Sequence, residues 1–165
     1  MSDSFSNKPP TGDEGSASAG DQATGEHMAR ALREYQQARF GPIHADYLNI
    51  FRDRLQSALR SEERPPLLVA NSEVDLFSAQ IEKLKSKMFD ETVRAMTHWF
   101  EVADKVGVRT EIDALLKESI EQFCESIGSD ALKIAEGYVD LLRDAESAWR
   151  QKYPEKLASL AKPSA

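Results

Sequence analysis

The stretch from Asn71 to Gly107, NSEVDLFSAQIEKLKSKMFDETVRAMTHWFEVADKVG, decides the fold. Its apolar residues recur at steps of three or four, which is typical of a helix with one buried face. No proline or glycine interrupts its interior, so the sequence predicts one long helix over about 72–106, roughly 50 Å in length. A helix of this length is typical of a bundle or a coiled coil. The apolar series consists of Val74, Phe77, Ile81, Leu84, Met88, Thr92, Ala95, Trp99, Val102 and Val106.

The first half of this helix carries a narrow apolar seam, flanked by Lys83, Lys85 and Lys87. A narrow seam between charged residues is typical of a helix that pairs with another helix. We therefore expect a second copy of the chain to bind along the long helix, which would give a homo-oligomer. The alternative is that the seam is ordinary core. The candidate interface residues are Val74, Phe77, Ile81 and Leu84.

Glycine and proline are expected to divide the rest of the chain into shorter helices. We expect breaks at Gly41 with Pro42, at Pro65 with Pro66, at Gly128 and at Pro154. The apolar run 67–70 is expected to lie outside the helices, either over the end of the bundle or against another subunit. The sequence thus predicts an all-α fold, a helical bundle organised on the long helix. The other predicted helices cover residues 28–40, 43–64, 111–127 and 130–153.

Residues 1–26 differ in composition from the rest of the chain. Ser, Gly, Thr, Asp and Ala dominate, and Phe5 is the only large apolar side chain. Such a segment buries too little apolar surface to offset the entropy of ordering, so a disordered acidic tail is expected. The tail is a solubilising segment, an export signal or an ordinary ragged terminus. The predicted domains are therefore this tail over 1–26 and a helical bundle over 27–165.

Composition limits the location and partners of the protein. No run of 18 or more apolar residues is present, so no transmembrane segment is expected. The N-terminus lacks a signal-peptide pattern, and we expect a cytoplasmic protein. A formal net charge of -7 argues against nucleic acid as the main partner. Cys124 is the only cysteine, and its apolar neighbours indicate a small buried hydrophobe.

No arrangement of residues indicates catalysis or a cofactor. A catalytic or metal site in a bundle needs ionisable side chains that face inward. The three histidines His27, His44 and His98 lie far apart in sequence, and His98 is expected at the surface. There is no phosphate-binding loop. We therefore predict no enzyme activity, no cofactor and no metal, and we interpret Trp99 and Trp149 as core or interface residues.

Two segments resemble the phasins, a family of helical proteins that coat bacterial polyester storage granules. The segments are FSAQIEKLKSKMFDETVRAMTHWFEVADK (77–105) and SDALKIAEGYVDLLRDAESAW (129–149), and the resemblance extends over roughly 71–153. It lies in the alternation of aromatic, small and charged residues, and it includes neither the Pro65–Pro66 loop nor the acidic tail. The resemblance implies a non-enzymatic, oligomeric protein that binds an apolar granule surface, and it assigns no role to a particular residue.

These observations lead to one functional hypothesis and one alternative. The hypothesis is a non-enzymatic helical protein-interaction module, such as an adaptor, chaperone, regulator or secreted effector, which self-associates through the long helix and binds an unidentified protein partner. The alternative is a phasin-like coat protein that binds an apolar granule surface through amphipathic helices.

Overall fold

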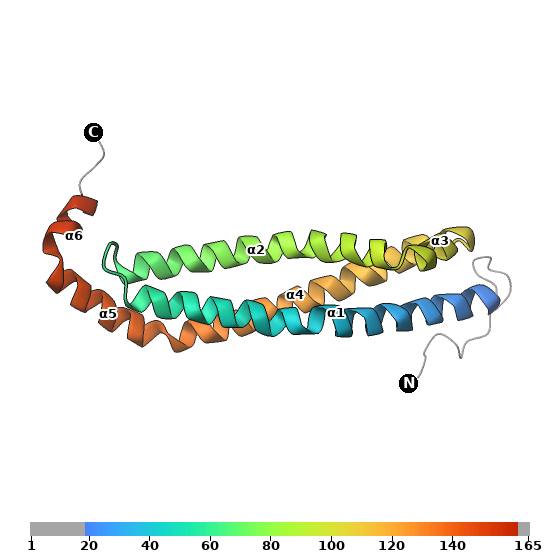
Figure 1. The fold of residues 1–165 in the computed structure, drawn as a ribbon, viewed down its shortest axis with the longest axis horizontal. Coiled ribbons are helices and arrows are strands. Elements are labelled where there is room, and N and C mark those ends of the chain that lie inside the picture. The colour runs from blue at the N-terminus through green and yellow to red at the C-terminus, as the bar shows by residue number, and fades with distance from the viewer. Residues whose placement is uncertain (1–18, 162–165) are drawn as a thin grey trace. The chain divides into compact units, whose positions relative to one another are not determined.

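The computed structural model describes residues 19–161, and in this range the chain forms six α-helices and no strand (Figure 1). The predicted all-α class is therefore confirmed. The helices are α1 (Ala19–Leu59), α2 (Pro66–Ala95), α3 (Thr97–Lys105), α4 (Arg109–Gly137), α5 (Val139–Lys152) and α6 (Pro154–Ala161).

The described chain divides into two compact units. Unit 1 contains residues 19–43 and 84–124, and unit 2 contains residues 44–83 and 125–161. Each unit therefore combines one segment of α1 and one of α2 with part of α4. The sequence predicts a single bundle domain over 27–165, whereas the structure groups the contacts of this region around two centres.

The core of unit 1 forms where α1, α2, α3 and α4 bury their apolar faces. The ring of Phe40 lies 6.5 Å from that of Phe123, centroid to centroid. Thr92 is fully buried, and its hydroxyl donates a hydrogen bond to the carbonyl of Met88 at 2.8 Å, which satisfies the buried polar group. Cys124 is also buried, as predicted. The most buried large side chains of this unit are Met28, Leu32, Phe40, Met88 and Leu116.

The core of unit 2 contains aromatic residues from three helices. Phe77 of α2 packs against Phe51 of α1 at a ring distance of 4.6 Å. Trp149 of α5 is 3% exposed, and its indole N–H donates to the carbonyl oxygen of Glu62 at 3.0 Å. Glu62 lies in the turn between α1 and α2, so this bond ties α5 to that turn.

A buried carboxylate strengthens the same connection. Glu146 of α5 accepts a hydrogen bond from the backbone N–H of Leu67 at 3.1 Å and another from Arg150 at 2.9 Å. Leu67 lies in the first turn of α2, where backbone N–H groups lack helical partners and the helix dipole favours a negative charge. The carboxylate therefore stabilises the start of α2 from another helix.

The predicted long helix over 72–106 is not found as one element. Pro66 begins α2 and places the apolar run 67–70 inside this helix, because proline is well tolerated at the first helical position. At the other end, Met96 separates α2 from α3 with φ -114° and ψ 34°. The hydroxyl of Thr97 donates to the carbonyl of Arg94 at 2.8 Å. Such side-chain bonds compete with the helical pattern, which accounts for a break at this position.

The predicted breaks at Gly41 with Pro42 and at Gly128 are wrong. Pro42 lies inside α1, which continues for 41 residues. Proline in a helix interior costs about 3 kcal/mol. Phe40 before it and Phe51 after it are buried, and each large apolar side chain contributes about 1.5–3 kcal/mol on burial. In the same way, buried residues on both sides of Gly128 carry α4 through this glycine to Gly137.

The N-terminal boundary also differs from the prediction. The acidic tail is predicted over 1–26, but α1 begins at Ala19 and includes the last part of this segment. Met28 and Leu32 are buried, so packing anchors the helix close to its start. The prediction for residues 1–18 lies outside the described residues.

Two predicted helix ends are confirmed. Gly107 follows α3 with φ +80°, in the left-handed region that glycine adopts at low cost. Pro154 begins α6, directly after Tyr153 closes α5. At both sites the backbone requirement is local, so the residue type predicts the structure.

Alanine substitutions at Gly107 and Gly128 are expected to have opposite effects on stability. Gly107→Ala should lower the free energy of unfolding by about 1–2 kcal/mol, because alanine is strained at this positive φ. Gly128→Ala should raise it by about 0.5–1 kcal/mol, because a Cβ there meets no atom within 4 Å and alanine is the better helix former. Urea unfolding followed by circular dichroism measures both. Equal changes in the two variants would contradict the assigned backbone conformations.

Candidate functional site

The four predicted interface residues do not share one environment. Phe77 and Ile81 are each 8% exposed, and Leu84 is 4% exposed, whereas Val74 is 38% exposed. The first three are covered by side chains of the same chain, so a second copy could contact them only after they left this interior. Self-association through this seam stays a prediction, and Val74 alone of the four is available on the surface.

Exposed large apolar side chains are concentrated in unit 2. Eight of them are between 38 and 61% exposed, and in the described part of the chain every one lies in this unit. Single exposed apolar residues are normal on protein surfaces, but a group of them indicates an interaction surface. They are Ile50, Leu68, Val74, Leu76, Leu132, Val139, Leu141 and Leu160.

One exposed helix face of unit 2 carries a row of uncharged side chains, with the exposed Asp75 at its edge. Leu68, Ser72, Leu76 and Ala79 are separated by steps of four, four and three, so they share one face of α2. All four are exposed, whereas the buried Phe77 belongs to the opposite face. We call this face, from Leu68 to Ala79, the α2 outer stripe. Its neutral and partly small side chains suit close contact with another helix.

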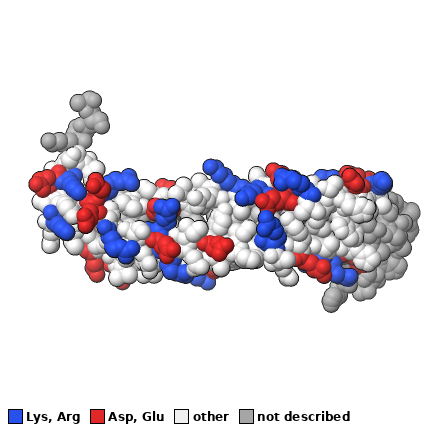
Figure 2. Space-filling view, in the orientation of Figure 1, with Lys and Arg blue, Asp and Glu red and all other residues white. Residues whose placement is uncertain are grey.

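The surroundings of Leu132 on α4 are different. The exposed residues near it on the same face include Glu125 and Glu136. Charges at these positions make this face a poorer apolar contact than the α2 outer stripe. Over the surface drawn in Figure 2, acidic and basic side chains alternate and do not form a large patch of one sign.

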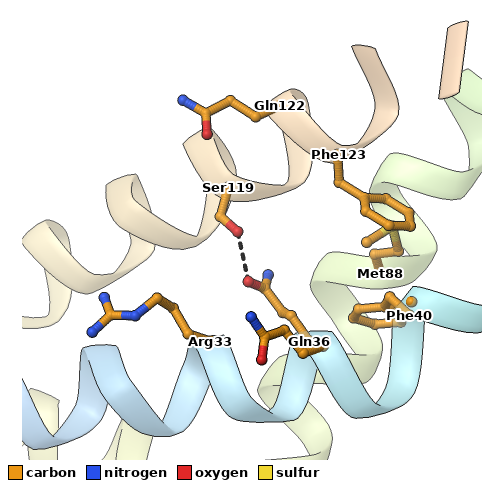
Figure 3. A pocket seen from close by; sticks show the side chains of 9 residues that line it. Arg33, Gln36, Phe40, Met88, Ser119, Gln122 and Phe123 are labelled. Carbon is orange, nitrogen blue, oxygen red and sulfur yellow. Dashed lines mark hydrogen bonds between the residues drawn. The ribbon is translucent and has the colours of Figure 1, made fainter. Parts of the chain in front are cut away.

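A groove in unit 1 combines polar and apolar side chains from α1 and α4, and Met88 of α2 also lines it (Figure 3). It has two lobes of about 410 and 290 Å³, which share the side chains of Arg33, Gln36, Ser119 and Gln122. Phe40, Met88 and Phe123 line the larger lobe, and Leu32, Leu115 and Leu116 line the smaller one. Gln37 adds a polar group to the larger lobe and Glu118 adds one to the smaller lobe, so polar and apolar side chains line both lobes.

One amide group in this groove is incompletely hydrogen bonded. The hydroxyl of Ser119 donates to Gln36 Oε1 at 2.6 Å, which joins α4 to α1 (Figure 3). The other end of the same amide, Gln36 Nε2, is buried and has no hydrogen-bond partner. A buried donor without an acceptor costs roughly 1–3 kcal/mol, so this atom is an unusual feature of the unit.

The groove could not be predicted from the sequence. Gln36 and Ser119 are 83 positions apart, and neither belongs to a motif. Their proximity depends on how α1 packs against α4. The only local signal is that each polar residue lies beside the apolar face of its own helix.

The described residues hold no group of three metal-ligating side chains. His44 contacts Asp130 at 2.9 Å, and His98 is exposed, as predicted. Hydrogen bonding to Asp113 raises the pKa of Arg109, but an arginine is already protonated at physiological pH, so this change provides no group for proton transfer. Within residues 19–161, no helix is long and apolar enough to cross a membrane.

Comparisons of the chain with models of known protein families, with curated proteins and with solved structures found no match.

Proposed function

We propose that the protein is a non-enzymatic helical interaction module that self-associates through the α2 outer stripe. The observation that carries this proposal is the row of exposed, uncharged side chains formed by Leu68, Ser72, Leu76 and Ala79. Burial of such a face in an interface is favourable, because each large apolar side chain contributes about 1.5–3 kcal/mol of free energy when it leaves water.

The proposed partner on this face is a second copy of the chain. A two-fold dimer would bring the same stripe from both copies together, so one interface would bury the leucines of both copies. The small side chains of Ser72 and Ala79 would allow the two helices to approach closely. The proposal retains the predicted homo-oligomer and moves its contact from the buried seam to the opposite face of the same helix.

Leu68→Glu combined with Leu76→Glu should convert a dimer into a folded monomer. Four leucines leave the interface of the dimer, so its dissociation constant should rise at least about a thousandfold. Sedimentation equilibrium measures the mass, and far-UV circular dichroism checks that helix content is unchanged, because glutamate at these exposed positions is solvated.

Leu132→Glu combined with Leu141→Glu is the matched control. These leucines are even more exposed than Leu68 and Leu76 but lie on α4 and α5, so this variant should remain a dimer. A monomeric wild-type protein would overturn the proposal. A control variant that also becomes monomeric would move the contact to α4 and α5.

The alternative proposal is a coat that binds an apolar surface. It is favoured by one observation, that the exposed apolar side chains of unit 2 come from α1, α2, α4, α5 and α6 and not from one helix alone. A coat protein is expected to adsorb to hydrophobic polymer particles as wild type, whereas an interaction module remains in solution. If the wild-type protein adsorbs to the particles and the leucine double variants adsorb only somewhat less, the result favours a coat protein.

A further inference from the structure

We infer that the groove between α1 and α4 of unit 1 is a binding site for a small amphiphilic carboxylate, such as a medium-chain fatty acid. The carboxylate would lie at Arg33 and Gln36, and the alkyl chain would lie along the apolar lining. This site is separate from the α2 outer stripe and does not depend on self-association.

The amide of Gln36 determines where the polar group of the ligand binds. Ser119 occupies Oε1 and thereby fixes the orientation of the amide, while the buried Nε2 retains a donor with no acceptor. An oxygen of the ligand would satisfy this donor after a small movement of the Gln36 side chain that exposes it to the groove. A neutral ligand oxygen could also do so, and the choice of a carboxylate therefore depends on the neighbouring charge.

That charge is provided by Arg33. It precedes Gln36 by three positions and so lies one turn earlier on the same side of α1, and it lines both lobes of the groove. Among the residues whose side chains are described, none forms an ion pair with Arg33. A carboxylate is the natural partner of a guanidinium, because the two groups form short, charge-assisted hydrogen bonds.

The apolar lining determines the rest of the ligand. Phe40 and Met88 are each 1% exposed and Leu116 is fully buried, so these side chains form the closed floor of the groove. The half-buried Leu115 and Phe123 present the apolar surface that an alkyl chain would contact. A lobe of about 410 Å³ is within the size range of small-molecule sites. Each methylene that the ligand buries there should tighten binding by up to about fourfold.

One acidic residue opposes the proposed ligand. Glu118 is exposed and lines the smaller lobe, so its negative charge repels a bound carboxylate through solvent. Its removal should therefore have the opposite effect to removal of Arg33. This pair of residues allows a test in which the sign of each change is known beforehand.

Titration calorimetry of the full chain with sodium decanoate, below its micelle concentration, tests the site. We expect saturable binding that is weaker for octanoate by up to about fifteenfold, since two methylenes are lost. 1-Octanol, which has the same chain length as octanoate without the charge, should bind at least about tenfold more weakly than octanoate.

Four variants locate the binding. Arg33→Gln should weaken decanoate binding by at least about tenfold, whereas Arg30→Gln, an exposed arginine outside the lining, should change it by less than about twofold. Glu118→Gln should tighten it by about two- to fivefold. Gly41→Leu should abolish it, because Gly41 lines the larger lobe and a side chain there meets open space, so the groove is filled without strain in the helix.

Three results would overturn the inference. The first is no saturable binding of decanoate. The second is binding that Arg33→Gln and Arg30→Gln change equally. The third is binding that survives in Gly41→Leu but is lost in the Leu68 and Leu76 double variant, which would assign the alkyl chain to the exposed surface of unit 2.

Discussion

Phe77→Glu combined with Ile81→Glu is expected to unfold the chain rather than separate two copies of it. Phe77 packs against Phe51 inside unit 2, and both substituted positions are only 8% exposed. Loss of the phenylalanine side chain alone costs about 3–5 kcal/mol, and each unpaired buried charge adds several more. This sum is comparable with the whole stability of a typical domain, about 5–15 kcal/mol.

Far-UV circular dichroism and sedimentation test this prediction together. The expected result is a large loss of helical signal at neutral pH. The Leu68 and Leu76 double variant is the matched control, because it introduces the same two glutamates into the same helix on its exposed face. A Phe77 and Ile81 variant that is monomeric with full helical content would restore the predicted seam as the interface.

Trp149→Ala should lower the free energy of unfolding by about 3–5 kcal/mol. The indole is 3% exposed, packs against Tyr153 at a ring distance of 5.5 Å and donates to the carbonyl of Glu62. Its removal leaves a cavity, and one of the two hydrogen bonds that this carbonyl accepts is lost, the other being donated by Lys156 Nζ at 2.9 Å. Because Glu62 lies in the turn between α1 and α2, this turn should also exchange its amide hydrogens faster in the variant.

Two controls separate packing from hydrogen bonding in this effect. Trp149→Phe retains most of the buried area and removes the N–H donor, so it should cost about 1–3 kcal/mol. Trp99→Ala should cost clearly less than Trp149→Ala, because Trp99 is only partly buried. Equal losses for the two alanine variants, measured by urea unfolding, would contradict the structure of unit 2.

The apolar pattern predicted which side chains of the long helix are buried, but not whether the same chain or a second copy covers them. Phe77, Ile81 and Leu84 were identified from their spacing, and all three are buried. A helical repeat distinguishes the apolar face from the polar one, but it contains no information on whether the same chain or a second copy covers that face. Trp99 shows the same limit, since its place in the repeat predicts burial whereas the structure leaves it partly exposed.

The sequence by itself determined the helical class, the burial of Cys124 and the ends at Gly107 and Pro154, because each depends on the preferences of a few neighbouring residues. Only the tertiary structure decided that α1 continues through Pro42 and α4 through Gly128, because the burial of large side chains on both sides outweighs the local cost of one proline or glycine. The tertiary structure also decided where the groove forms. The contact of Gln36 with Ser119 depends on packing between segments 83 positions apart, which no local preference specifies.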